Sequence, residues 1–257
     1  AVSALTWLTL IKLDLSYDKN LLGFVFFATI TGYNFVKYFG LAKFHHRRLA
    51  GWLKVIQMFS LLAFLAMCYF AYDLEAKTLT FIGVLAIVTF FYAIPIMVPK
   101  RYLFDDHKNL RQIGGLKVYV IALIWMLTTV FLPIVDNGIS ISADVIIIGV
   151  QRFCYVLVLM LPFEIRDLNY DSLKLATIPQ KIGIKKTKII GVLLLMLFLI
   201  LDFFKDILKV ESIVSTLIIT FITLLFVMFS NKNQSKYYSA FWVESLPVIW
   251  LLILFLS

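Results

Sequence analysis

Apolar residues occur in long runs along the chain, and short polar stretches separate these runs. A helix needs about 20 mostly apolar residues to cross a hydrocarbon core of roughly 30 Å, because it rises about 1.5 Å per residue. Strands of a membrane β-barrel would alternate apolar and polar residues, and these runs do not. The pattern therefore predicts nine transmembrane helices, at residues 1–13, 20–42, 53–72, 78–98, 117–135, 143–164, 187–204, 212–230 and 237–256.

The composition supports this interpretation. Of the 257 residues, 62% are hydrophobic, whereas soluble domains are closer to half apolar. The three histidines and two cysteines form neither a metal-ligand pattern nor a disulfide framework. We therefore expect an all-α, polytopic membrane protein, and we expect its first run, 1–13, to be truncated at its start.

The polar connections alternate between basic and acidic. Lysine and arginine concentrate in connections 43–54, 99–117, 165–188 and 231–236, whereas the other connections are short and mostly acidic. The positive-inside rule assigns the basic set to the cytoplasm, with the N-terminus inside and the C-terminus outside. The net charge of +9 is thus a topology signal, and we expect no nucleic-acid partner. The expected location is a bacterial inner membrane, with the long loops 99–117 and 165–188 in the cytoplasm.

Three carboxylates lie at the cytoplasmic end of the sixth predicted span. Glu164, Asp167 and Asp171 are spaced i, i+3, i+7, which places them on one face of a helix. Because three like charges repel one another and Arg166 is expected to point elsewhere, a divalent cation is one candidate to offset them. Carboxylate oxygens suit Mg²⁺, which commonly shares its ligands with substrate phosphates. The alternative is a solvated helix end whose acids pair with nearby lysines.

This stretch resembles the second aspartate-rich motif of the UbiA superfamily of intramembrane prenyltransferases. Glu164, Asp167 and Asp171 are followed by Thr177, Pro179 and Gly183, similar to the family's (N/D)xxDxxxD, Thr-Leu-Pro-like segment and glycine. The resemblance implies nine helices around a central cavity, in a single domain over 1–257. This domain would have two four-helix halves, 1–98 and 117–230, and a ninth helix at 237–256.

Basic residues after the fourth predicted span are similar to a second segment of that family. The segment consists of Tyr92, Lys100 and Arg101, followed by Arg111 and Lys117. These residues are expected to contact a diphosphate, since basic side chains at a cavity mouth bind phosphate oxygens. The alternative is that these charges only mark the cytoplasmic side of the membrane.

The family's first motif, NDxxD at the end of the second helix, is not kept. The corresponding residues are Asn34, Phe35, Lys37 and Tyr38. Asn34 matches the leading asparagine and is expected to contact the diphosphate, but aromatic residues stand where the aspartates would be. Lys37 is expected to replace one metal as a fixed positive charge. The alternatives are that it pairs with Asp167 or Asp171, or extends to the interface.

Two charged residues fall inside predicted spans, which is costly unless they are paired or face a cavity. Arg152 lies in the sixth span and Glu244 in the ninth. They could pair with each other, and we expect a structural ion pair or hydrogen bond that fixes helix packing rather than a cavity acid at Glu244.

The resemblance implies a Mg²⁺-dependent prenyltransferase that moves an isoprenyl group from a polyprenyl diphosphate to an aromatic or lipid acceptor. Asp167, Asp171 and Lys37 are the expected catalytic residues, and Glu164 joins the two aspartates as a metal ligand. The alternative is a catalytically degenerate relative that serves as a structural or lipid-binding subunit, with a membrane-protein partner or as a homo-oligomer. A third interpretation, a secondary transporter using Arg152 and Glu244, lacks paired broken helices in the two halves.

Overall fold

The computed structural model describes residues 1–41, 50–93, 115–169, 177–206 and 208–256, and of residues 36–41, 50–54 and 92–93 it describes the backbone alone. Within these ranges the chain is helical and contains no strand. The prediction of an all-α protein is confirmed.

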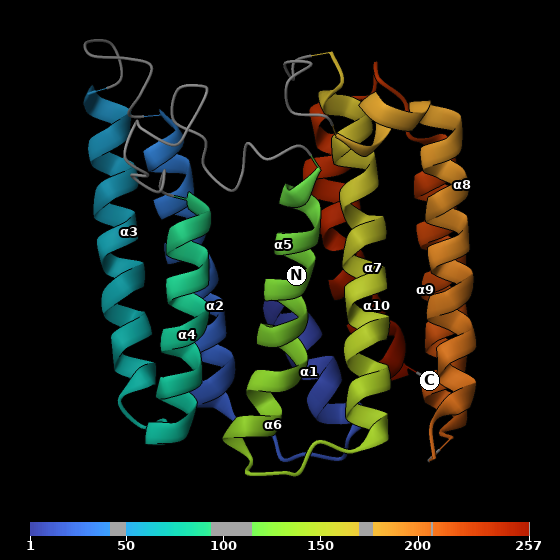
Figure 1. Ribbon diagram of the computed structural model, residues 1–257. Coiled ribbons are helices and arrows are strands. Elements are labelled where there is room, and N and C mark those ends of the chain that lie inside the picture. Colours follow the sequence, from blue (N-terminus) through green and yellow to red (C-terminus); the bar gives the residue numbers. More distant parts are fainter. Residues whose placement is uncertain (42–49, 94–114, 170–176, 207, 257) are drawn as a thin grey trace, which may run out of the picture.

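The helices run roughly parallel or antiparallel to one another, side by side (Figure 1). In chain order they are α1 (Val2–Lys12), α2 (Lys19–Leu41), α3 (Ala50–Ala71), α4 (Ala76–Ala93), α5 (Leu116–Met126), η3 (Leu127–Phe131), α6 (Leu132–Asp136), α7 (Ala143–Asp167), α8 (Ile178–Ile200), η5 (Leu201–Phe204), α9 (Val210–Phe229), η6 (Tyr238–Val243) and α10 (Glu244–Leu256).

Five helical stretches of the described chain are long and apolar enough to cross a bilayer, which makes this a membrane protein. They are Leu116–Asp136, Ala143–Asp167, Ile178–Phe204, Val210–Phe229 and Tyr238–Leu256. Val2–Lys12, Val55–Ala71 and Ala76–Phe91 are shorter apolar helices. The count of nine spans and the central cavity stay predictions.

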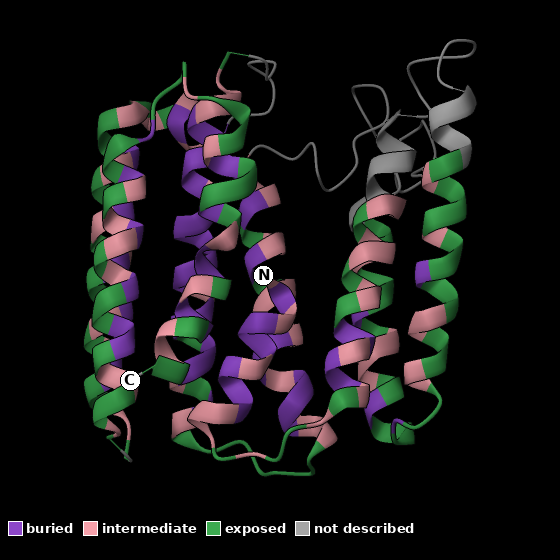
Figure 2. Ribbon diagram, turned by 180° about the vertical axis from the view of Figure 1, so that it is seen from behind, coloured by how far each residue is buried: buried purple, intermediate pink, exposed green. Residues whose placement is uncertain are grey.

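Helix α7 lies at the centre of the packing. It contacts α5, α8, α9 and the short segments η3, η5 and η6. Its buried side chains form much of the largest apolar core, in which the rings of Tyr155, Phe198 and Trp250 contact one another with centroids 5.2 to 5.5 Å apart. Exposed residues cover most of the outer surfaces of the helices, and buried residues concentrate along the inner helices (Figure 2).

Glycine allows close contacts of α8 with α7 and α9, and of α2 with α3. A Cβ atom on Gly191 of α8 would lie 2.9 Å from Leu161 Cδ1 of α7 and 3.0 Å from Val227 Cγ1 of α9. A Cβ atom on Gly23 of α2 would lie 2.7 Å from the ring of Phe70 on α3. Small residues at helix contacts let backbones approach closely in membranes, where dispersion rather than water exclusion drives association.

The start of α8 differs from the prediction. The apolar run predicted a span from residue 187, but the helix begins at Ile178. Thr177 N–H donates to Gln180 Oε1 at 3.0 Å, which is one of the two hydrogen bonds of a capping box. Gly183 then interrupts the helix with φ 81° and ψ 160°, a conformation accessible essentially to glycine alone. A short basic turn therefore precedes the membrane-spanning part of α8.

Candidate functional site

The candidate carboxylates lie at the C-terminal end of α7. This helix continues through Glu164 and ends at Asp167, so these two acids occupy one face, three residues apart. Glu164 is only 3% exposed and Asp167 is 24% exposed. Asp171 lies outside the described residues. Pro162 lies in the same helix, two residues before Glu164. Its carbonyl accepts a hydrogen bond of 2.7 Å from the side-chain amide of Gln234.

Glu164 has a cationic neighbour from another helix. Lys117 Nζ, in the first turn of α5, lies 3.5 Å from Glu164 Oε1. A carboxylate at the end of a membrane span is costly without a compensating charge. Lys117 supplies such a charge, and this contact connects α5 to α7 where both helices reach the same end of the bundle (Figure 1).

Asp167 is paired with its own neighbour, which corrects the prediction for Arg166. Arg166 Nε donates to Asp167 Oδ1 at 2.7 Å, and Arg166 Nη1 donates to Ser239 Oγ at 2.8 Å. The guanidinium also lies 5.4 Å from the ring centroid of Phe163. Arg166 can reach Asp167 because its long side chain folds back at the helix end, where no further turn intervenes. The described acids of the cluster therefore both have a cation nearby.

Asn34 lies on α2, whose C-terminal end is at the same end of the bundle as that of α7 (Figure 1). Its side-chain nitrogen and the hydroxyl of Thr31 are buried and have no hydrogen-bond partner among the described residues. The next residue, Phe35, stacks on Phe90 of α4 with ring centroids 6.2 Å apart. Two buried polar atoms three residues apart thus mark the place where the first motif was expected.

The other predicted diphosphate contacts cannot be placed relative to this cluster. Lys37 and Tyr92 belong to helices whose backbone alone is described at these positions, and the basic residues of the long loop lie outside the described ranges: Lys100, Arg101 and Arg111. Of the predicted site, the described structure brings together Glu164 and Asp167, pairs the predicted phosphate contact Lys117 with Glu164, and adds Arg166.

Arg152 makes structural hydrogen bonds between helices, one of the two expected roles, and does not pair with Glu244. Arg152 is buried on α7 and donates instead to α1, from Nη1 to the Leu5 carbonyl at 3.0 Å and from Nη2 to Thr9 Oγ1 at 3.2 Å. Glu244 is exposed. These acceptors could not be predicted from the sequence. Almost every helix has hydroxyls and carbonyls of this kind, so nothing marks the ones that Arg152 contacts.

A second polar cluster, which the sequence analysis did not single out, lies at the opposite end of α7. Lys12, Lys205 and Lys209 come together there with Asp14, Asp144 and Asp202. The sequence contained one indication of this cluster, because these lysines are exceptions in the otherwise acidic set of connections.

Comparisons of the chain with protein-family models, with curated proteins and with solved structures find no match.

Proposed function

We propose that this chain is a UbiA-like intramembrane prenyltransferase, which transfers an isoprenyl group from a polyprenyl diphosphate to an aromatic or lipid acceptor. The observation that carries the proposal is the buried carboxylate of Glu164 at the end of a membrane-spanning helix, with Lys117 beside it and Asp167 one turn further on. Ionisable groups are rare inside membranes and usually serve a function there.

The proposed topology gives this end of the bundle a cytoplasmic location, in a bacterial inner membrane with nine transmembrane helices around a central cavity. The C-terminal ends of α2, α4 and α7, which precede three of the basic connections in the sequence, lie at this end (Figure 1). Soluble isoprenyl diphosphate would reach the site from that side, and its apolar tail would enter the hydrocarbon region.

Mg²⁺ fits the chemistry of the described donors. Glu164 and Asp167 offer carboxylate oxygens on one helix face, and Mg²⁺ in phosphate sites often uses only one or two protein carboxylates. Asp171 would complete the ligand set. When bound, the ion would neutralise the diphosphate and stabilise it as a leaving group.

The protein's own cations would bind and orient the diphosphate. Arg166, anchored by Ser239, holds one oxygen of Asp167 and leaves Oδ2 outside that pair. In the proposal, Lys37 replaces one metal of the family's pair, and the remaining donors come from the side chains predicted to bind the diphosphate: Asn34, Tyr92, Lys100, Arg101 and Arg111.

The test is binding of a non-hydrolysable isoprenyl diphosphate analogue to the purified chain, with and without Mg²⁺. We expect binding that requires Mg²⁺ and that Asp167→Asn weakens at least about 10-fold, because even the loss of a group that only orients a metal ligand commonly costs 10- to 100-fold. Glu75→Gln, at the other end of the bundle, removes an equivalent charge and should bind like the wild type. Binding that is absent with and without Mg²⁺, or that Asp167→Asn leaves unchanged, would contradict the proposal.

A second candidate function is a non-catalytic subunit that binds lipid or a membrane-protein partner. It is favoured by the ion pairs of Glu164 and Asp167 with Lys117 and Arg166, because acids that are already neutralised can fix helix packing without a metal. Under this alternative the analogue does not bind, and the chain purifies from its native membrane as an oligomer or in a complex.

A further inference from the structure

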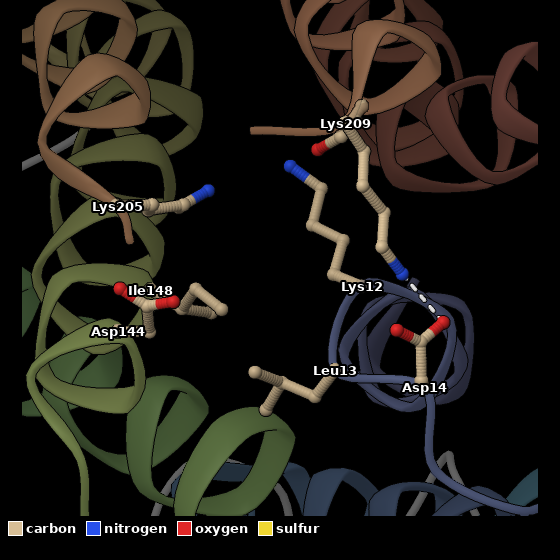
Figure 3. A pocket seen from close by; sticks show the side chains of 8 residues that line it. Lys12, Leu13, Asp14, Asp144, Ile148, Lys205 and Lys209 are labelled. Carbon is tan, nitrogen blue, oxygen red and sulfur yellow. Dashed lines mark hydrogen bonds and ion pairs between the residues drawn. The ribbon is translucent and has the colours of Figure 1, made fainter. Parts of the chain in front are cut away.

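A cavity of about 90 Å³ lies at the end of the bundle opposite the C-terminus of α7. It lies where α1 ends, α7 begins and α9 begins, close to the turn that follows η5. Its lining consists of Lys12, Leu13, Asp14, Asp144, Ile148, Lys205, Lys209 and Ser212. Lys12 and Lys205 extend toward one another across it, and Lys209 reaches from the start of α9 to Asp14 at its edge (Figure 3).

Lys12 is the cavity lysine that forms no direct ion pair with a carboxylate of the described residues. Its Nζ donates to Thr216 Oγ1 at 3.1 Å and lies 4.7 Å from the ring centroid of Trp250. No carboxylate of the described residues lies within 4 Å of it. A hydroxyl and an aromatic face solvate an ammonium group but do not neutralise it.

The carboxylates nearest the cavity already have partners. Asp202 is 1% exposed and pairs with Lys205, and its Oδ1 also accepts a hydrogen bond from Gln151 at 3.2 Å. Asp14 pairs with Lys209 at 2.5 Å. Asp144 accepts a hydrogen bond of 3.0 Å from the backbone N–H of Asp206.

A second buried cation adds to the positive charge in this region. Arg152 is 2% exposed and lies 5.5 Å from the centroid of the same Trp250 ring. Its acceptors are the carbonyl of Leu5 and the hydroxyl of Thr9, which are neutral. The cluster thus holds four cations, Lys12, Lys205, Lys209 and Arg152, against three carboxylates, Asp14, Asp144 and Asp202. Because charges interact more strongly where water is excluded, this excess of one positive charge favours an anion on this side of α7.

The N-terminus of α9 also favours an anion in the cavity. Lys209 occupies the N-cap position and its side chain makes no capping hydrogen bond, so the first N–H groups of this 20-residue helix are not satisfied by a cap. Ser212, in the first turn, lines the cavity. Helix N-termini carry a partial positive charge that attracts anions.

We propose that this cavity binds a phosphate group, held by Lys12, Lys205 and Lys209. A phosphate presents several acceptor oxygens in different directions, which suits ammonium donors that come from three separate segments. The cavity lies at the ends of membrane-spanning helices, so the phosphate belongs either to a phospholipid headgroup or to a free phosphate ion. This inference is independent of the proposed prenyltransferase function, which concerns the other end of the bundle.

The experiment measures thermal unfolding of the delipidated full chain in detergent, with two additions. One arm adds inorganic phosphate at an ionic strength matched with sodium chloride, and the other adds phosphatidylglycerol. A ligand that binds the folded state alone raises the unfolding temperature. Lys12→Met removes the unpaired cation, and Thr216 keeps its own hydrogen bond to the Ser212 carbonyl at 2.7 Å, so we expect this variant to fold.

We expect at least one addition to raise the unfolding temperature of the wild type, and Lys12→Met to weaken the apparent affinity on the order of tenfold, as the loss of a charged hydrogen bond does. Lys209→Met is a second variant, and the matched control is Lys77→Met, whose ion pair with Glu75 is exposed. A response to phosphate identifies a free-phosphate site, and a response to lipid alone identifies a headgroup site. No response to either addition, or a response that both cavity variants retain in full, would overturn the proposal.

Discussion

Lys117 Nζ lies 3.5 Å from Glu164 Oε1, and this contact joins the first turn of α5 to the last turns of α7. The two partners differ sharply in exposure, at 30% for Lys117 and 3% for Glu164. Removing the cation from a buried acid costs more stability than removing the acid from an exposed cation. The contact is therefore asymmetric, and truncation of the lysine is the informative change.

We predict that Lys117→Met lowers the free energy of unfolding by about 1 kcal/mol, because Glu164 keeps its burial and loses this cation. The figure is small for a buried acid because the lysine is partly exposed and water screens the pair. Thermal unfolding in detergent measures the effect.

A double-mutant cycle tests the cause of that loss. The double variant Glu164→Gln with Lys117→Met should lose less free energy of unfolding than the sum of the two single variants. In the double variant no buried carboxylate is left without its cation. Lys77→Met is the matched control, because its pair with Glu75 is exposed on both sides and should contribute a few tenths of a kcal/mol at most. Equal effects of Lys117→Met and Lys77→Met would count against a structural role for the Lys117 contact.

A second prediction concerns the interruption of α8. Gly183→Ala should lower the free energy of unfolding by roughly 1 to 3 kcal/mol, because φ of 81° is strained for any residue with a Cβ atom. No atom lies within 4 Å of the position that this Cβ would take, so the cost comes from the backbone alone.

The matched control for that prediction is Gly83→Ala in α4, where the glycine is helical and the added Cβ also meets no atom within 4 Å. Alanine has the higher helix propensity, so this change should be neutral or stabilising by up to about 1 kcal/mol. If the two substitutions changed the free energy of unfolding equally, Gly183 would not have a positive φ in the protein in detergent.

A third prediction follows from the partners of Arg152. Because Arg152 contacts α1 and not Glu244, the effects of Arg152→Met and Glu244→Gln on stability should add within about 0.5 kcal/mol. By contrast, the effects of Arg152→Met and Thr9→Val on stability should not add, since Thr9 Oγ1 accepts one of the two hydrogen bonds that Arg152 donates. Coupling between Arg152 and Glu244 well above 0.5 kcal/mol would restore the ion pair that the sequence suggested.

The apolar runs were enough to predict where most helices lie. The run at 143–164 became α7 and the run at 212–230 became α9, each within about three residues of its predicted limits. These predictions succeeded because a membrane span must satisfy its backbone hydrogen bonds internally, so a long apolar run has few alternatives to a helix.

The start of α8 could not be read from the same signal. Residues 181–188 carry four lysines, which hydropathy assigns to a loop. The helix instead begins at Ile178, with a hydrogen bond from Thr177 N–H to Gln180 Oε1 at its start, and Gly183 interrupts it. These local features depend on only a few residues, and an average over 20 residues does not register them.

Side-chain partners were the least predictable part of the candidate site. Spacing alone placed Glu164 and Asp167 on one face of α7, as the structure has them. Their cations, Lys117 and Arg166, depend on how α5 packs and on how a side chain folds back at a helix end. Residues brought together by tertiary packing across 47 positions of sequence leave no periodic pattern.

The last prediction concerns the proposed topology, in which the basic connections are cytoplasmic. The test uses single cysteines in a background where Cys68 and Cys154 are replaced by serine and alanine, and a maleimide that cannot cross the membrane. Lys232→Cys lies between α9 and η6, and Asn137→Cys lies between α6 and α7, at the two ends of the bundle. In intact cells we expect the reagent to label Asn137→Cys, and to label Lys232→Cys only after the membrane is permeabilised. The charge asymmetry would be the cause, since lysine and arginine near helix ends are retained on the cytoplasmic side during insertion. The reverse labelling pattern would place Glu164 and Asp167 outside the cell, away from any cytoplasmic supply of a soluble diphosphate, and would remove the main physical support for the prenyltransferase proposal.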